Sequence, residues 1–324
     1  MLALSAGCRS TGEAVVDKGG ATGERVLLTV DFEPGQTLRY KFVSHRDIAL
    51  DWDPNAASSE NRIQKQSERL EMVIAYTALE VDPYGVSTVE GACESVQATR
   101  AGGPARRTGA TDAVQDAKGK TFTLKVDSRG KIVDGAELEA FIKDMGAKAF
   151  RADGSRGRVK EPDMIGDFIA GQWFLWDAVS RVPRPAEGVA VGRTWESQLL
   201  APTPMVMRLA RNVTYKLDEI RPTDTGQLAV ITSSYTLAEA VPSTWPVPYA
   251  GRFQMSGTFG FLGAYKTRGL HGAGQELFDI DAGRVVRRSQ KYQIEMRASL
   301  PPMGIRANPH ITIDQTLTME LLNP

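Results

Sequence analysis

Only five side chains in this 324-residue sequence carry a thiol or an imidazole: Cys8, Cys93, His45, His271 and His310. The histidines lie far apart, and no HxH, HxxxH or CxxC spacing occurs, so we expect neither a transition-metal site nor a metal cofactor. Cys93 stands among the alternating strand residues of VSTVEGACESVQATR. It is therefore predicted to pack as a small buried hydrophobe, and not to act as a nucleophile.

The usual catalytic motifs are missing as well. The sequence holds no G-x-S-x-G elbow, H-E-x-x-H, P-loop or ordered dinucleotide fingerprint. Asp51–Asn55 begins like a calcium loop, but Ala56 and Arg62 occupy the positions that require Gly and Glu. We expect a polar loop there, extending to Gln66, and no enzyme activity. A hydrolase remains the least favoured alternative, because carboxylates far apart in the sequence can meet in the folded chain and form an active site.

The composition of the chain excludes some classes of binding partner. The 39 basic and 39 acidic residues give a formal net charge of zero, which argues against a nucleic-acid partner. No apolar run reaches the roughly 20 residues that span a bilayer. Hydrophobic residues make up 42% of the chain, enough for a substantial core, and two cysteines exclude a disulfide scaffold.

The first residues are typical of a targeting signal. Leu4–Cys8 (LSAGC) resembles the lipobox of bacterial lipoproteins, with Ala6 and Gly7 at the two positions before the lipidated cysteine. Ser5 is less usual there than Leu, and only Met1–Leu4 stands upstream, where a signal peptide has an apolar region of roughly 7–15 residues. Residues 1–8 are predicted to be the remnant of such a signal, with Cys8 as the lipid attachment site.

Residues 9–24 are rich in Gly, Ser, Thr and Ala, which predicts a flexible tether. The resemblance implies a membrane partner, reached through acyl chains on Cys8, because each buried methylene contributes about 0.8 kcal/mol. It also implies a bacterial cell-envelope location. Arg9 follows the cysteine where aspartate marks inner-membrane retention in some bacteria, so we expect the outer membrane.

Most of the remaining chain alternates apolar and polar residues, as half-buried strands do. From Leu38 to Trp52 one parity is mainly apolar but includes Ser44 and Arg46, whereas His45 falls on the polar parity. Residues 310–321 alternate most regularly, which predicts an inner strand with one buried face. The fold class predicted is α+β and mostly β, with long antiparallel strands in one or more curved sheets, divided into β-rich halves at 25–134 and 184–324.

Two helices are expected between the halves, in a central segment 135–183. Asp134 and Glu137 have the spacing of a capping box before a helix at about 135–151. Glu161–Pro183 is the strongest helical pattern, and predicts a second helix at about 162–181. Its apolar face comprises Ile165, Phe168, Ile169, Trp173 and Trp176.

The halves themselves look related. A long hairpin at 68–99 is echoed at 209–237, and TFTLKVDSRGKIV at 121–133 is echoed by ELFDIDAGRVVRR at 276–288. Two matches in the same order favour an internal duplication, although unrelated meanders can look alike. Between the matched pieces, Phe253, Met255, Phe259 and Phe261 share one parity, which predicts a strand.

The order of these segments resembles a bacterial family. GQTLRYKF, the LEMVIAYTALEVDPYGVSTV hairpin, KTFTLKVDSRGKI, the central helices, the Pro185–Trp195 pattern P-x(3)-V-x-V-G-x-x-W and a late F-D-x-x-x-G-R-V are similar to an uncharacterised family of predicted lipoproteins, classed as a domain of unknown function. The resemblance runs from Val26 to the C-terminus. The family defines no catalytic or binding residues, so it implies none here.

These observations predict a non-catalytic binding module of the cell envelope, with a hydrophobic small molecule or an envelope protein as partner. Phe168, Trp173 and Trp176 are the candidate lining of a ligand cavity, because a helix that is apolar on most sides faces either a core or a cavity. Core packing is the favoured role of these rings. The alternative function is a structural or interaction module that docks a partner strand along a sheet edge or the proline-rich 241–248 stretch.

Overall fold

The structure is a computed structural model that describes residues 25–54, 63–102, 111–224, 226–300 and 308–322. Its main feature is one sheet of eleven strands, in the order β10-β11-β12-β14-β15-β16-β2-β3-β4-β5-β6, with every neighbouring pair antiparallel. The strands are β2 (Thr37–Asp51), β3 (Ile63–Val81), β4 (Ser87–Gly102), β5 (Thr121–Val126), β6 (Ile132–Asp134), β10 (Thr194–Leu200), β11 (Ala210–Thr223), β12 (Gly226–Leu237), β14 (Gly263–Asp279), β15 (Arg284–Ser299) and β16 (His310–Leu321). The predicted fold class is confirmed.

The two β-rich halves form a single sheet. β2 to β6 pair in chain order, as β10, β11, β12, β14 and β15 do, and β16 lies between β15 and β2. β16 is thus an inner strand, and its residues alternate between buried and more exposed as predicted. The two meanders follow the same order, whereas the internal duplication stays a hypothesis.

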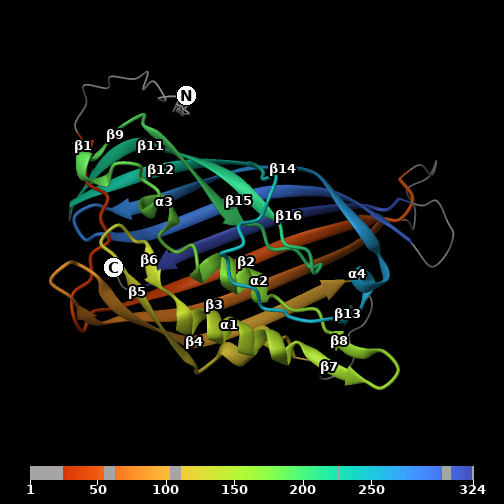
Figure 1. Cartoon of the computed structure of the whole chain (residues 1–324). Coiled ribbons are helices and arrows are strands. Elements are labelled where there is room, and N and C mark those ends of the chain that lie inside the picture. Colours follow the sequence, from red (N-terminus) through yellow and green to blue (C-terminus); the bar gives the residue numbers. More distant parts are fainter. Residues whose placement is uncertain (1–24, 55–62, 103–110, 225, 301–307, 323–324) are drawn as a thin grey trace, which may run out of the picture.

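One face of the sheet forms the core. In β2 the apolar parity is buried, including Leu38, Tyr40 and Ile48, and side chains of that parity pack beneath the helices. α1 (Ala136–Lys148), α2 (Ile165–Gln172) and α3 (Asp177–Ser180) lie across this face (Figure 1). Buried apolar residues of both halves belong to one cluster. No helix among the described residues has the length and apolar character required to cross a bilayer.

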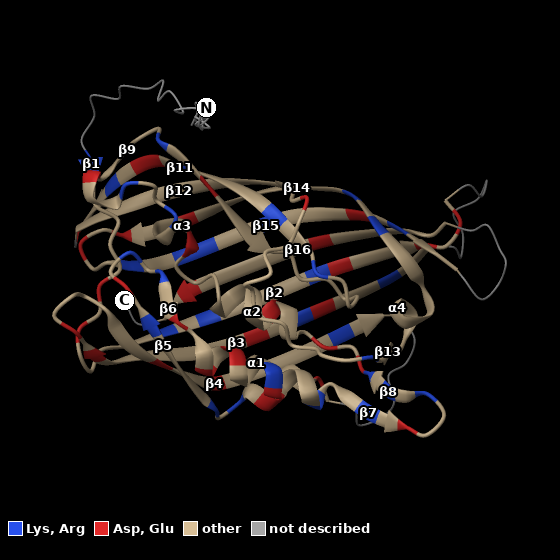
Figure 2. Cartoon of the chain, viewed as in Figure 1, with Lys and Arg blue, Asp and Glu red and all other residues tan. Residues whose placement is uncertain are grey.

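The other face is polar. Lys41 pairs with Glu71 across the sheet at 2.7 Å, and Arg39 pairs with Glu94. Lys and Arg alternate with Asp and Glu along the strands, without a region of one sign (Figure 2). Because exposed pairs of this kind contribute about 0–1 kcal/mol each, this face adds solubility more than stability.

The first central helix differs from its prediction in two respects. Glu137 does not close a capping box, because its carboxylate accepts a hydrogen bond from the Thr123 backbone N–H at 3.0 Å, while Asp134 accepts from the Ala136 N–H. The helix also ends at Lys148 instead of about 151. Phe150–Asp153 (β7) pairs instead with Gly157–Lys160 (β8), because strand pairing satisfies the backbone groups that a longer helix would use.

The second helix is broken, so a continuous helix at about 162–181 was wrong. α2 ends at Gln172, and α3 begins at Asp177. Arg288 of β15 donates hydrogen bonds to the carbonyl oxygens of Phe174, at 3.0 Å, and Leu175. A continuous helix would use these oxygens four residues later. The Arg288 guanidinium therefore replaces the backbone N–H partners of these two carbonyl groups, and the helix is interrupted there.

Smaller elements complete the fold. Arg25–Val26 (β1) pairs with Val189–Ala190 (β9), and Gln254–Met255 (β13) pairs with β8 in a small sheet of order β13-β8-β7. Two 3₁₀ helices span Ala113–Ala117 (η1) and Pro185–Glu187 (η2). Thr258–Phe261 forms a helix, α4, so the strand predicted from the parity of residues 253–261 was wrong beyond Met255. β3 also starts at Ile63, inside the polar loop expected to reach Gln66.

The sheet has two distinct ends. The hairpin turns at 82–86, 127–131 and 280–283 lie at one end, together with β1; we call it the turn end. The start of β3 and the end of β4 lie at the other end, beside β8, β13 and α4 (Figure 1). The fifteen steps from Gln66 to Val81 separate the two ends by about 50 Å at about 3.3 Å per residue.

Candidate functional site

A large hollow lies at the end of the sheet opposite the turn end. It has a volume of about 1110 Å³ and is bounded by the start of β3, the end of β4, the β7–β8 hairpin and the β13–α4 segment. We call it the α4 cleft. Its lining comprises residues 66–68, 100–102 and 254–261, with Arg151, Arg156, Val159, Glu161, Pro162 and Pro204.

Two glycines allow α4 to form the cleft wall. Gly257, the residue before the helix, has φ of +77°, a conformation that residues with a Cβ rarely adopt. At Gly260 a Cβ would lie 1.8 Å from the carbonyl oxygen of Met255, so only glycine permits α4 to turn back this closely on β13. The hydroxyl of Tyr265 donates to the Phe259 carbonyl oxygen at 2.5 Å and fixes the helix to β14.

The walls of the cleft combine apolar and polar side chains. Val159 and Phe259 are buried, whereas Phe261 lies at the mouth with 48% of its surface exposed. Met255, Pro162 and Pro204 add apolar surface in the same cleft. Ligand pockets commonly have volumes of about 300–1,000 Å³ and apolar walls with a few polar groups. The α4 cleft has about the upper end of that size, and its mixed lining suits an amphipathic small molecule better than a wholly apolar one.

The floor is a buried ion network. Glu68 accepts hydrogen bonds from Arg46 Nε and from Arg100 Nε, both at 2.6 Å, and Arg100 Nη1 donates to Asp112 at 2.6 Å. Arg46 also contacts Asp167 of α2 at 3.0 Å. Burial by itself raises the pKa of Glu68, but the charges of Arg46 and Arg100 lower it to about 2. Glu68 therefore stays ionised at neutral pH.

The same network holds α2 in place. Asp112 accepts hydrogen bonds from the backbone N–H groups of Val114 and Met164, and Asp163 accepts from that of Ile165. Lys160 Nζ lies 2.6 Å from Asp163. Acidic groups favour a helix N-terminus because its N–H groups carry partial positive charge. Each carboxylate thus joins a strand or loop of the cleft to the start of the helix that covers the core.

The carboxylates that the structure describes around the cleft are all engaged within the protein. Both oxygens of Glu68 accept from arginine, and the carboxylate of Glu161 accepts from Arg151 and from Ser256 Oγ. Burial raises the pKa of Asp112 and of Asp167, and both carboxylates are bound within the network. These groups hold the cleft together, and its space is lined by polar side chains beside the apolar ones of Met255, Phe259 and Phe261.

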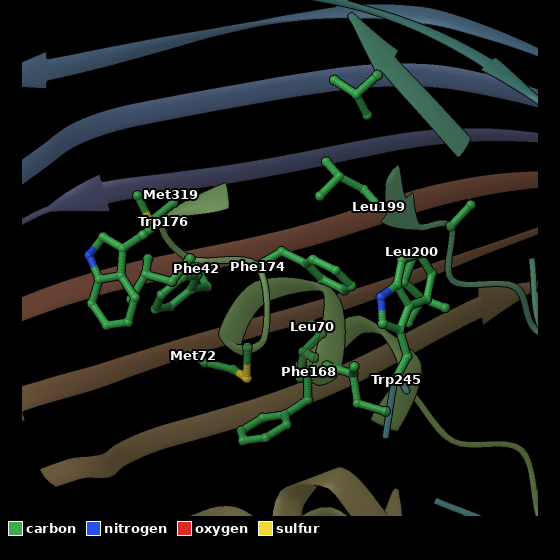
Figure 3. Close-up of a cluster of buried hydrophobic side chains, with 14 of the residues drawn as sticks. Phe42, Leu70, Met72, Phe168, Phe174, Trp176, Leu199, Leu200, Trp245 and Met319 are labelled. Carbon is green, nitrogen blue, oxygen red and sulfur yellow. The ribbon is translucent and has the colours of Figure 1, made fainter. Parts of the chain in front are cut away.

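The interior beneath α2 is the second place of interest, because Phe168 and Trp176 were predicted there. Both rings are buried: Phe168 lies between Phe122 and Phe141, with centroids 6.3 and 5.7 Å away, and Trp176 meets Tyr76 edge-on at 6.0 Å. Figure 3 shows Phe168, Trp176 and Phe174 between the broken helix and strands of the sheet. Trp173 is partly buried, with its ring against Gly135.

A cavity of only about 30 Å³ adjoins this interior. Asp167, Ala170 and Gly171 of α2 line it together with residues of β2, β3, β15 and β16, whereas Phe168, Trp173 and Trp176 do not. A volume of that size holds about one water molecule. The structure therefore places Phe168 and Trp176 in the same core, each packed against other rings, and ligand binding at Phe168, Trp173 and Trp176 stays a prediction.

The remaining candidates are spread through the chain. Cys8 lies outside the described residues. Cys93 is buried as predicted, and burial raises the pKa of its thiol to about 12, so the nucleophilic thiolate does not form at neutral pH. His45 lies on the polar face with Nε2 3.3 Å from Asp47. The described residues hold no group of three or more His, Cys, Asp or Glu placed to bind a metal ion.

A second, polar groove of about 680 Å³ follows β10, the first strand of the main sheet, and includes Pro242, Thr244 and Trp245. It lies where the proline-rich stretch meets that edge. Sequence reasoning did not find the α4 cleft, because residues of five separate segments form it. The local signal was Gly257 within the aromatic-rich segment 253–261. That segment was interpreted as a strand.

Comparisons with known proteins give little to place beside this geometry. No protein-family model and no curated protein matches the chain. Among solved structures, one described as lipid–protein interactions in lipovitellin aligns with 90% of this chain at 11% identity and a TM-score of 0.43. The aligned part is 26% of that chain, so this protein spans about a quarter of its length.

Proposed function

We propose that this protein is a non-catalytic binding protein of the bacterial cell envelope, anchored through Cys8, and that it holds a hydrophobic or amphipathic small molecule in the α4 cleft. One observation carries the proposal: a cleft of about 1110 Å³ has an exposed phenylalanine, Phe261, at its mouth. The carboxylates of Glu68 and Glu161 are bound within the protein, so the cleft offers a ligand apolar surface beside polar side chains.

The energetics favour an apolar ligand part against α4. Burying apolar surface contributes about 25 cal/mol per Å², so covering the exposed part of Phe261, with Met255 and Phe259 beside it, supplies binding energy without new hydrogen bonds. Arg156 adds a positive charge on the exposed β7–β8 hairpin. An amphiphile with its chain along α4 and its polar head towards Arg156 and Arg151 fits both surfaces.

The test is displacement of a fluorescent apolar probe. Full-chain protein with Cys8→Ser, which carries no acyl chain, is titrated with N-phenyl-1-naphthylamine and then with long-chain alcohols and fatty acids. We expect saturable probe binding that Phe261→Ser weakens about tenfold, the effect of losing roughly 1.4 kcal/mol of apolar contact. Mass spectrometry of lipids that co-purify without detergent identifies the natural ligand class.

Leu79→Ser is the matched control. Leu79 has a similar exposed fraction, 54%, but lies at the turn end and outside the cleft. If both variants lose probe binding equally, or neither does, the ligand site is not the α4 cleft. The anchor is tested separately by metabolic labelling with palmitate, which the Cys8→Ser chain must not incorporate.

A further inference from the structure

The turn end carries an unusual number of exposed apolar side chains. Of the nine large hydrophobic residues that are exposed in the described chain, six lie at this end, and Tyr84 is 91% exposed. We call them the apolar rim: Leu27, Leu79, Tyr84, Val133, Val191 and Leu322. Single exposed apolar residues are normal on a soluble protein, but their gathering at one end marks an interaction surface.

The backbone places these residues at a common end although they are far apart in sequence. Gly35 N–H donates to the Ala78 carbonyl oxygen beside Leu79, and the N–H of Leu322 donates to the Arg39 carbonyl oxygen. Val30 N–H donates to Ser128 in the turn before Val133. β1 pairs with β9, which sets Leu27 near Val191. Figure 1 shows β1, β9, β6 and the C-terminus at this end.

Carboxylates in the turns at this end are bonded back to the backbone. Asp82 accepts hydrogen bonds from the N–H groups of Tyr84 and Val86, at 2.8 and 2.9 Å, in the turn that exposes Tyr84. Asp127 likewise accepts from Lys131 N–H, and Asp281 from Gln227 N–H. These carboxylates are already hydrogen-bonded, which lowers the cost of bringing the turns close to a surface that excludes water.

We infer that the apolar rim contacts a lipid bilayer, which sets the α4 cleft about 50 Å from the membrane surface. The inference rests on the proposed anchor. The described chain begins with Arg25, in β1 at the turn end, and residues 9–24 connect it to Cys8. Sixteen residues separate Cys8 from Arg25. A chain of that length made of Gly- and Ser-type residues has a root-mean-square length of about 20–24 Å, so an anchor at Cys8 keeps this end close to the bilayer.

Charge makes a specific prediction about the lipid. Near the rim, Arg25, Arg129 and Lys131 stand among Glu33, Asp224 and other acidic residues, so neither sign dominates (Figure 2). Attraction to an anionic surface therefore contributes little, and insertion of apolar side chains drives the contact. Binding must be nearly the same with and without anionic lipid, and must change little with salt.

The experiment couples the full chain through Cys8 to maleimide-bearing lipid in phosphatidylcholine vesicles, prepared with and without phosphatidylglycerol. Cys93 is buried and does not react. Hydrogen–deuterium exchange is compared with protein whose Cys8 is blocked, in the presence of the same vesicles. We expect exchange at residues 27, 79–86 and 132–134 to slow at least about fivefold on coupling, with no change at residues 254–261.

Variants of the apolar rim test whether the protection comes from contact with the bilayer. Tyr84→Asp with Leu79→Asp must remove the protection, whereas Val247→Asp, at an exposed site outside the rim, must leave it intact. Protection at 254–261, or at neither end, overturns the proposal. Protection that grows with protein density on the vesicle assigns the rim to a second copy instead. Because coupling is chemical and no ligand is needed, failure here is distinct from loss of probe binding in the cleft.

Discussion

The interior beneath α2 and the α4 cleft are built from similar residues but differ in what those residues face. Under α2 the rings face one another, as Trp176 does with Tyr76, and the adjoining cavity is about 30 Å³. In the cleft, Phe261 remains half exposed beside about 1110 Å³ of space. Aromatic content alone therefore does not mark a binding site, and the useful distinction is whether apolar surface remains without a partner in the protein.

The largest effect on stability is expected in the interior. Trp176→Ala removes a buried ring that also contacts Phe32 edge-on at 5.8 Å, so it should cost towards the upper end of about 3–5 kcal/mol. Urea unfolding measures the loss. Probe affinity in the cleft should stay unchanged in the folded variant, and a variant that loses affinity with little loss of stability would reverse the roles assigned to the two regions.

The ion network joins the two regions, and Glu68 is its centre. Glu68→Gln leaves Arg46 and Arg100 buried without their shared counter-charge, which costs about 3 kcal/mol or more. The comparison is with Glu94→Gln on the polar face, where the pair with Arg39 is exposed and its loss should cost under about 1 kcal/mol. Equal losses in urea unfolding would show that the buried network contributes no more than a surface pair.

Acid should weaken the contribution of Glu68 to the free energy of unfolding. The pKa of Glu68 is about 2 in the folded chain, against an ordinary value of 4.5, so its stabilisation is complete above pH 4.5 and is lost as pH falls towards 2. The difference in unfolding free energy between the wild type and Glu68→Gln should fall by about 2 kcal/mol between about pH 6 and pH 3. Paired unfolding curves at these pH values measure it, and a constant difference would rule out Glu68 as the titrating group.

The local sequence pattern predicted much of this fold, because strands and turns depend on residues only a few positions apart. The parity from Leu38 to Trp52 even placed Ser44 and Arg46 on the buried face. Their partner Asp167 is more than 120 residues away, so no local pattern shows the network. The break after α2 depends on Arg288 in the same way. Long-range contacts decide the ion network and the cleft, and these carry the candidate site.

Gly260→Ala gives the smallest effect on stability and the most selective effect on the cleft. A Cβ there would lie 1.8 Å from the Met255 carbonyl oxygen, so α4 must move away from β13. Alanine favours a helix over glycine by about 1 kcal/mol, which offsets part of the strain, and we expect a net loss near 1 kcal/mol. Probe affinity should fall more than tenfold, since Phe259 and Phe261 move with the helix.

Gly154→Ala, in the neighbouring β7–β8 hairpin, is the matched control because a Cβ at that position would meet no atom within 4 Å. It should change neither stability nor affinity. If Gly260→Ala binds the probe as the wild type does, the α4 wall is not part of the ligand site, and the difference between the two regions would then concern packing density and not function. If it loses affinity while the core keeps its stability, the free apolar surface of α4 is what separates a binding site from a core.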